Sequence, residues 1–129
     1  MTSLHVARRD RVNLRAWATF HPTDEYNEHP YITVVIVNEG RRPAILRLFG
    51  GDLVGGGIGG RILGKDSEGI RLGESERHEE SVTADDSLLI GPDGALEYRT
   101  FYFEDTLGNR HPVRDCEEAL NQLRSTGSR

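Results

Sequence analysis

The chain has 129 residues, a net charge of −5 and one cysteine, Cys116. This length is typical of a single domain and is enough to bury a core without disulfides or metal. One cysteine excludes an intrachain disulfide and a four-thiolate zinc site, and the negative charge argues against nucleic acid or an anionic membrane surface as the default partner.

The N-terminal residues, MTSLHVARRDR, lack the apolar stretch of a secretory signal peptide. The longest mostly apolar run, 32–37, is far shorter than the ~18–20 residues that a transmembrane helix needs. We therefore expect a soluble, cytoplasmic protein with no membrane partner. A component of a virus particle fits the same criteria.

The first strand is predicted at 11–20, after a flexible polar lead-in at 1–10. Apolar and polar side chains alternate there, which is typical of a strand with one buried and one solvated face. Trp17 breaks the alternation, and an aromatic residue in such a position either covers the sheet or contacts a partner. A polar loop with Tyr26 follows at 21–30.

The strongest strand signal is Tyr31–Val37, in which every residue from Ile32 onward is β-branched. A strand without apolar and polar alternation is usually a central one. A turn is predicted at 38–43, because Gly40 can adopt a positive φ and Pro43 cannot donate to a sheet. We expect the next run, Ala44–Phe49, to pair with Tyr31–Val37.

The segment 50–64, GGDLVGGGIGGRILG, is the most unusual one. It is rich in glycine, yet it carries too many apolar residues for a solvated linker, among them Leu53, Val54 and Ile58. We expect an ordered glycine-rich ribbon or irregular strand, with glycines that permit bends.

The second half of the chain continues the pattern of short strands. Ile70 and Leu72 anchor a charged segment at 65–81, and a turn at 72–75 leads to an exposed edge strand, Arg77–Thr83. A short helical turn is predicted at 85–90 and a turn at 91–94.

The last predicted strands are Ala95–Glu104, with Phe101 and Phe103 in the core, and Arg110–Val113. The hairpin turn between them, 105–109, places Gly108 at a positive φ. Asp115 then caps a helix over 116–124, whose apolar stripe is Ala119, Leu120 and Leu123, and a disordered tail is expected at 125–129.

About seven short strands with frequent turns predict an all-β fold, an antiparallel β-sandwich over 11–113 followed by a short C-terminal helix at 114–124. The predicted core consists of Val12, Leu14, Ile32, Val34, Ile36, Ile45, Leu48, Leu72, Val82, Phe101 and Phe103.

Three segments carry a resemblance: ITVVIVNEGRRPAIL, IRLGESERHEESV and YRTFYFEDTLGNRHPV. Together they resemble small bacterial and phage-borne immunoglobulin-like β-sandwich domains without an established activity. That group has an Asn-x-Gly-Arg-Arg-Pro turn, as at 38–43, a Leu-Gly-Glu segment, as at 72–74, and an aromatic-x-Asp-x-x-Gly-Asn turn, as at 103–109. The glycine cluster and the terminal helix depart from the group. The resemblance implies an immunoglobulin-like fold and no catalytic residues.

Two glycine patterns match nucleotide-binding motifs without their context. Residues 55–60 match GxGxxG, and residues 59–66 nearly match GxxxxGK[ST], but Asp66 replaces the hydroxyl that ligates magnesium. Neither match precedes a predicted helix. We expect no nucleotide and no other cofactor.

Other reactive groups also lack the spacing that chemistry needs. The histidines (His5, His21, His29, His78 and His111) are read as exposed, without zinc spacing, and no calcium loop is present. Glu79 and Glu80 are read as a solvated pair. Cys116 stands among carboxylates, which raise a thiol pKa and make a poor nucleophile. We expect no metal and no enzyme activity.

The preferred hypothesis is therefore a non-enzymatic immunoglobulin-like module that acts through contact with a protein partner or by self-association, as an accessory or structural component that fits a phage origin. The expected contact surfaces are Leu53, Val54 and Ile58 on one side, and Trp17 and Tyr26 on another. The alternative is a small-ligand or carbohydrate-binding sandwich in which Trp17, Tyr26 and Tyr31 are stacking platforms. An enzyme site assembled from distant residues is a third hypothesis.

Overall fold

The structure is a computed structural model that describes residues 13–25, 28–83 and 98–127, and all structural statements concern these residues. The predicted turns at 85–90 and 91–94 and the first residues of the predicted strand Ala95–Glu104 lie outside them. Its elements in chain order are β1 (Leu14–His21), β2 (Tyr31–Asn38), β3 (Ala44–Asp52), β4 (Ile58–Ile62), η1 (Lys65–Ser67), β5 (Ile70–Leu72), β6 (Arg77–Thr83), β7 (Tyr102–Asp105), β8 (Arg110–Arg114) and α2 (Cys116–Gly127).

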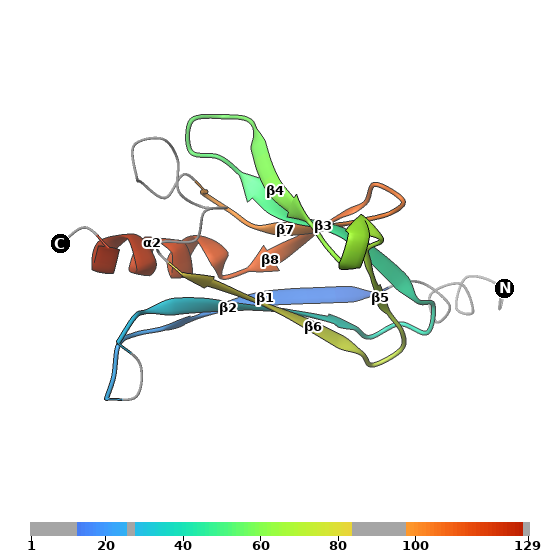
Figure 1. Cartoon of the computed structure of the whole chain (residues 1–129), viewed down its shortest axis with the longest axis horizontal. Helices are drawn as coiled ribbons and strands as arrows, with labels where there is room; N and C mark the ends of the chain where they lie inside the picture. The colour runs from blue at the N-terminus through green and yellow to red at the C-terminus, as the bar shows by residue number, and fades with distance from the viewer. Residues whose placement is uncertain (1–12, 26–27, 84–97, 128–129) are drawn as a thin grey trace, which may run out of the picture.

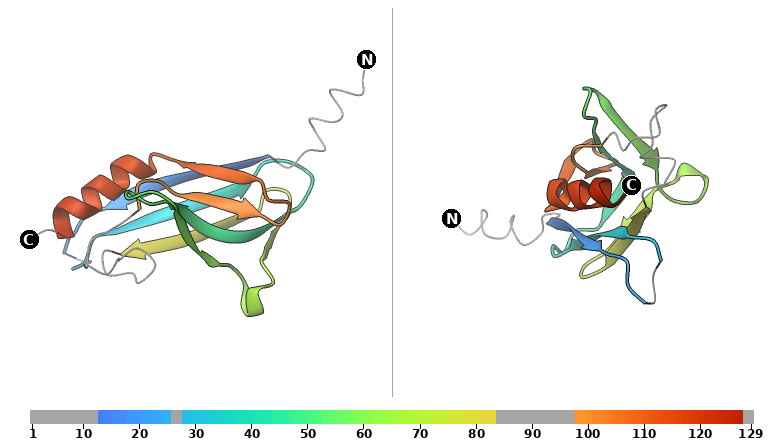
Figure 2. Two further views of the ribbon diagram at one scale, coloured as in Figure 1. Left: turned by 90° about the horizontal axis from the view of Figure 1, so that it is seen from above. Right: turned by 90° about the vertical axis from the view of Figure 1, so that its left-hand side faces the viewer.

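The eight strands form one sheet in the order β4-β3-β7-β8-β1-β2-β6, and β5 pairs with β3. The sheet curls into a half-barrel, with β1, β2 and β6 on one side and β3, β4 and β7 on the other (Figure 1). The right view of Figure 2 looks along the molecule and shows the curl with α2 at the near end. Within the described residues, β4 and β6 are the two edges of the sheet.

The expectation of an antiparallel sheet is wrong at one pair of strands. β1 and β8 run parallel, with Ala16 opposite Val113 and Trp17 opposite Arg114, so the sheet is mixed. Parallel neighbours need a long connection. Here that connection is almost the whole described chain, because the first described strand pairs with the last.

The predicted pairing of Tyr31–Val37 with Ala44–Phe49 is also wrong. β2 has β1 on one edge and β6 on the other, so neither edge is free for β3. β3 pairs instead with β7, β4 and β5. The turn after Asn38 therefore carries the chain across the core to the other side of the curl.

Apolar side chains from both sides fill the curl. The predicted core residues that are buried are Ile32, Val34, Ile36, Leu72, Val82, Phe101 and Phe103. Leu14 and Leu48 are partly buried, and Val12 lies outside the described residues. Ile45 is a wrong prediction, since its side chain is 41% exposed while Leu46 and Phe49 are buried. The register of β3 against β7 shifts between Leu46 and Leu48, and such a bulge reverses the alternation of faces.

Helix α2 closes one end of the curl against β1 and β2 (Figure 2). Its buried residues, Cys116, Ala119, Leu120 and Leu123, follow the spacing of one helical face, which confirms the predicted stripe. The helix continues beyond Arg124 to Gly127, so three residues expected in a disordered tail are helical. In the described part of the chain, no helix is long and apolar enough to cross a membrane.

Candidate functional site

The hairpin of β3 and β4 contains the glycine-rich segment, which is ordered. Two glycine pairs lie opposite each other in it, Gly50 with Gly60 and Gly51 with Gly59. A Cβ on Gly51 would overlap the carbonyl oxygen of Thr100, and one on Gly59 would overlap the hydroxyl of Tyr98. Glycine at these positions therefore lets the segment that precedes β7 cross directly over the hairpin.

The tip of this hairpin is a tight turn. The Leu53 N–H donates to the Gly57 carbonyl at 3.0 Å, and the Gly56 N–H donates to the Leu53 carbonyl at 3.1 Å. Gly56 and Gly57 have φ values of 97° and 84°, which favour glycine. The glycines thus serve backbone geometry, and the expected ordered ribbon is confirmed as a β-hairpin.

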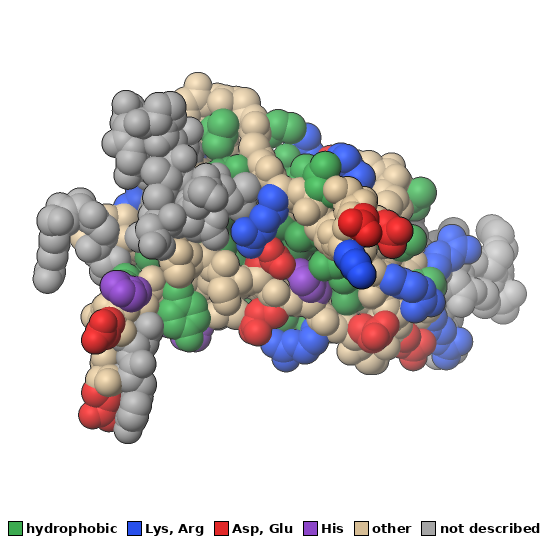
Figure 3. Space-filling view, in the orientation of Figure 1, with side chains coloured by type: hydrophobic (Ala, Val, Ile, Leu, Met, Phe, Trp, Pro, Cys, Tyr) green, Lys and Arg blue, Asp and Glu red, His purple; other side chains and the backbone are tan. Residues whose placement is uncertain are grey.

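The hairpin presents apolar side chains to solvent. Val54 is 63% exposed, Ile58 is 56% exposed and Ile62 is 53% exposed; these three residues are called the hairpin surface below. Figure 3 shows hydrophobic side chains along this hairpin at the top of the view. Of the three residues predicted for this contact, Val54 and Ile58 lie on the hairpin surface, whereas Leu53 is half-buried and packs against the core. Ile62 is a member that sequence reasoning missed.

A polar cluster joins the two edges of the sheet. The Arg61 side chain on β4 donates two hydrogen bonds to Oε1 of Glu80 on β6, at 3.1 and 2.6 Å. The His78 Nε2 lies 2.6 Å from the other Glu80 oxygen. Burial raises the pKa of Glu80, but the hydrogen bonds from His78 and Arg61 outweigh it and hold this pKa below its usual value.

This cluster overturns the interpretation of Glu80 and His78 as solvated. Both side chains are mostly buried, and the His78 ring meets Phe103 edge-on at 6.4 Å. Residues two apart on a strand share a face, so the spacing of His78 and Glu80 in Arg77–Thr83 was the available signal. The sequence around Glu80 could not predict the contact with Arg61, because Arg61 lies on another strand.

Trp17 lies on the other side of the molecule from the hairpin surface. It is half-buried on the outer face of β1, opposite Val35, and the Arg15 guanidinium lies 5.2 Å from its ring centre. Tyr31 lies four positions from Val35 along β2, about 13 Å away, and its ring stacks on His21 at 4.5 Å. Trp17 and Tyr31 therefore do not form one stacking platform. Tyr26 lies outside the described residues.

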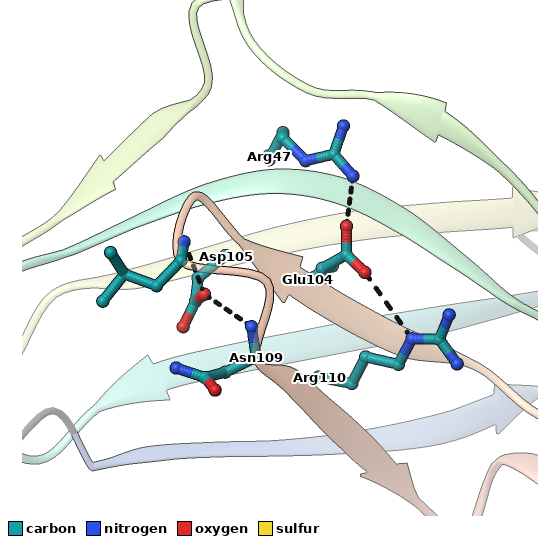
Figure 4. A network of polar contacts seen from close by, with 6 residues as sticks. Arg47, Glu104, Asp105, Asn109 and Arg110 are labelled. Carbon is teal, nitrogen blue, oxygen red and sulfur yellow. Dashed lines mark hydrogen bonds and ion pairs between the residues drawn. The ribbon is translucent and has the colours of Figure 1, made fainter.

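Charged side chains also link the strands β3, β7 and β8 on the outer face of the sheet (Figure 4). Glu104 accepts a hydrogen bond from Arg47 of β3, and Arg110 of β8 lies 3.5 Å from its other oxygen. The hydrogen bond from Arg47 lowers the pKa of Glu104 below its usual range.

The neighbouring Asp105 stabilises the β7–β8 turn. One of its oxygens accepts the backbone N–H groups of Leu107 and Asn109, and the other lies 2.9 Å from His111 Nε2. Gly108 in this turn has a φ of 85°, as predicted. The hydrogen bonds of Asp105 therefore hold the turn in place, which is a structural role.

A hollow of about 670 Å³ lies where β7 and β8 meet the start of α2. Its lining includes Asp52, Arg110, Glu117, Glu118 and the Cys116 thiol. That thiol is buried and accepts a hydrogen bond from the Phe101 N–H at 3.3 Å. Burial, with a smaller contribution from Glu117, raises the pKa of Cys116, as expected in direction, and a protonated thiol is a weak nucleophile.

Among the residues that the structure describes, no group of three or more histidine, cysteine, aspartate or glutamate side chains could hold a metal ion.

Comparisons with known proteins add little to this geometry. No protein-family model and no curated protein matches the chain. One solved structure, "X-ray structure of Northeast Structural Genomics Consortium target SoR45", aligns with 81% of this chain and 82% of its own. Its sequence identity is 10% and its TM-score is 0.34, so it supports no argument about fold or function.

Proposed function

We propose that the protein is a non-enzymatic, immunoglobulin-like module that acts through protein contact at the hairpin surface. The observation that carries this proposal is the exposure of Val54, Ile58 and Ile62 on a hairpin with an ordered backbone. Exposed apolar patches on a protein surface often mark sites where a partner binds.

The order of the strands supports the immunoglobulin-like assignment. Such domains place their strands A, B and E in one sheet and C, F and G in the other. Here β1, β2 and β6 lie on one side of the curl, and β3, β7 and β8 follow one another on the other side. The first and last strands, β1 and β8, join the two groups.

The rigidity of the hairpin supports a role in binding. Gly51 is packed against Thr100 and Gly59 against Tyr98, and the tip of the hairpin is fixed by two backbone hydrogen bonds. A surface that is already ordered loses little conformational entropy when it binds, which favours affinity. The free, buried thiol of Cys116 fits a reducing compartment such as the cytoplasm.

The test compares partner capture by three forms of the protein. A photo-reactive residue at position 54 records direct contact in native lysate, and it is combined with wild-type sequence, with Ile58→Asp or with Leu107→Asp. Leu107 is the matched control, because it is 81% exposed but lies on the β7–β8 turn. We expect cross-linked partner with wild type and Leu107→Asp, and at least tenfold less with Ile58→Asp. Equal cross-linking by all three forms would refute the hairpin surface as the contact.

A further inference from the structure

We propose that the occupant of the hairpin surface is a second copy of this chain, which pairs with the first through β4, edge to edge and antiparallel, about a two-fold axis at Gly60. This inference rests on the proposed function, because it names the partner that the same surface binds.

The first argument is the direction of the backbone groups on β4. The Leu53 N–H donates to the Gly57 carbonyl, and the Leu63 N–H donates to the Arg47 carbonyl, so hydrogen-bonded pairs stand at both ends of the hairpin. Hydrogen-bonded and non-hydrogen-bonded pairs alternate along an antiparallel ladder. Gly59 and Arg61 therefore bond to β3, while Ile58, Gly60 and Ile62 turn their N–H and carbonyl groups away from it.

The second argument is the symmetry of these outward residues. Ile58 and Ile62 stand at equal distances from Gly60 along the strand. An antiparallel pairing centred on Gly60 places Ile58 opposite Ile62 of the second copy, and Ile62 opposite its Ile58. Each outward residue then exchanges hydrogen bonds with its opposite number, which is the self-complementarity that a two-fold interface requires.

The third argument is what this pairing buries. The Ile58 and Ile62 side chains are each more than half exposed, and both lie on the same face of β4. In the pair, each isoleucine packs against an isoleucine of the other copy. Gly60 between them is also exposed and adds no side chain that would hold the strands apart.

The fourth argument is the contrast between the two edges of the sheet. Natural proteins protect exposed edge strands with charged side chains. Edge strand β6 has exposed Arg77 and Glu79, whereas the exposed residues of β4 are isoleucine and glycine. The one charge of β4, Arg61, is bonded to Glu80 of its own chain. Pairing at β4 therefore leaves no charge without a partner, and β4 is the edge that fits a second copy.

The contact is short, because β4 has five residues. Stable interfaces bury about 1,200–2,000 Å² in total, and two short strands provide less than large obligate dimers. We therefore expect a dimer in equilibrium with monomer, so that its population changes with protein concentration.

The experiment is sedimentation velocity of the full chain over a concentration series, for wild type, Ile62→Lys and the control Leu107→Lys. We expect wild type and Leu107→Lys to shift from monomer to dimer together, and Ile62→Lys to need at least tenfold more protein for the same shift. A wild type that stays monomeric, or an Ile62→Lys variant that dimerises like the control, overturns the inference.

Amide hydrogen exchange of the wild type tests the register without any substitution. Exchange at Ile58, Gly60 and Ile62 should slow as concentration rises, while Gly59 and Arg61 should be protected throughout. Slowing at other strands with none at β4 overturns the pairing. If the wild type is monomeric but Ile58→Asp still loses a cross-linked partner, the dimer fails and the proposed function stands.

Discussion

Asn38 holds the point where the chain crosses from one side of the curl to the other. Its side-chain amide donates to the Arg42 carbonyl at 2.9 Å and to the Leu72 carbonyl at 3.0 Å, and its oxygen accepts the Gly40 N–H at 2.9 Å. The side chain is fully buried. A single residue thus satisfies three backbone groups, of which the Leu72 carbonyl and the Gly40 N–H are in buried hydrogen bonds, and it ties the turn to β5.

Substitution Asn38→Ala should destabilise the protein strongly. It leaves two carbonyl groups and one N–H without their partner, and each unsatisfied buried group costs ~1–3 kcal/mol, so we expect a loss of about 3 kcal/mol in the free energy of unfolding. Urea unfolding measures this loss. Asn109→Ala is the matched control, because Asn109 is exposed and meets Asp105 through its backbone N–H. A similar effect of both substitutions would contradict this account of Asn38.

The roles of some single residues can be predicted from the sequence, and those of others cannot. Gly40 and Pro43 predicted a turn at the correct place, because turn chemistry is local. The bond from Asn38 to Leu72 spans 34 residues, and no local pattern reveals it. Ile45 was assigned to the core for a similar reason, since the bulge in β3 depends on the neighbouring β7.

At the scale of elements, the β3–β4 hairpin shows that one glycine cluster contains two kinds of glycine. Gly51 lies under the Thr100 carbonyl and has no room for a side chain. Gly55 lies in the turn, where a Cβ would meet nothing within 4 Å. The composition of 50–64 predicted an ordered ribbon correctly, but the crossing segment that requires Gly51 comes from a distant part of the chain.

The two glycines should respond differently to the same substitution. Gly51→Ala forces a methyl group into the backbone of Thr100, and such overpacking costs ~1–3 kcal/mol or more. Gly55→Ala places its methyl in open space, and surface changes of this kind are usually within about 0.5 kcal/mol. Thermal unfolding of both variants beside the wild type measures the difference. Equal melting temperatures for the two variants would show that the segment around Thr100 does not exclude a side chain at position 51.

At the scale of the whole molecule, the described sheet stays open between β4 and β6, and side chains rather than a backbone ladder join these edges. Arg61 comes from one edge, and Glu80 and His78 come from the other. The all-β class, the edge position of Arg77–Thr83 and the C-terminal helix could all be predicted from local patterns. The curl of the sheet and the polar cluster between β4 and β6 could not be predicted, because both depend on contacts between strands that are distant in sequence.

The polar cluster of Arg61, His78 and Glu80 predicts how the stability of the fold depends on pH. The folded-state pKa of Glu80 is lowered, so its ionised form stabilises the fold above the pKa of the unfolded chain, and this stabilisation is lost as the pH falls. We expect Glu80→Gln to cost about 1 kcal/mol at pH 7, since one charge-assisted cluster near the surface is lost. The cost should shrink as the pH falls below about 4.3, the usual glutamate pKa, because the unfolded chain then takes up a proton at Glu80 before the folded chain does.

Urea unfolding of the wild type and Glu80→Gln at pH 7 and at about pH 3 measures this dependence, because the low value lies below the usual glutamate pKa. Glu79→Gln is the control, since Glu79 is the exposed neighbour on the same strand. If Glu80→Gln lowers the free energy of unfolding by the same amount at both pH values, the charge of Glu80 does not stabilise the contact between β4 and β6.

The parallel pairing of β1 with β8 also decides when the protein can finish folding during its synthesis. Ala16 and Val113 lie near opposite ends of the chain, so the ribosome releases β1 long before its partner exists. Contacts between such distant residues close large loops and form slowly. Until β8 emerges, the nascent chain carries β1 with one edge paired to β2 and the other edge unpaired, and any chaperone that assists this protein has that open edge to shield.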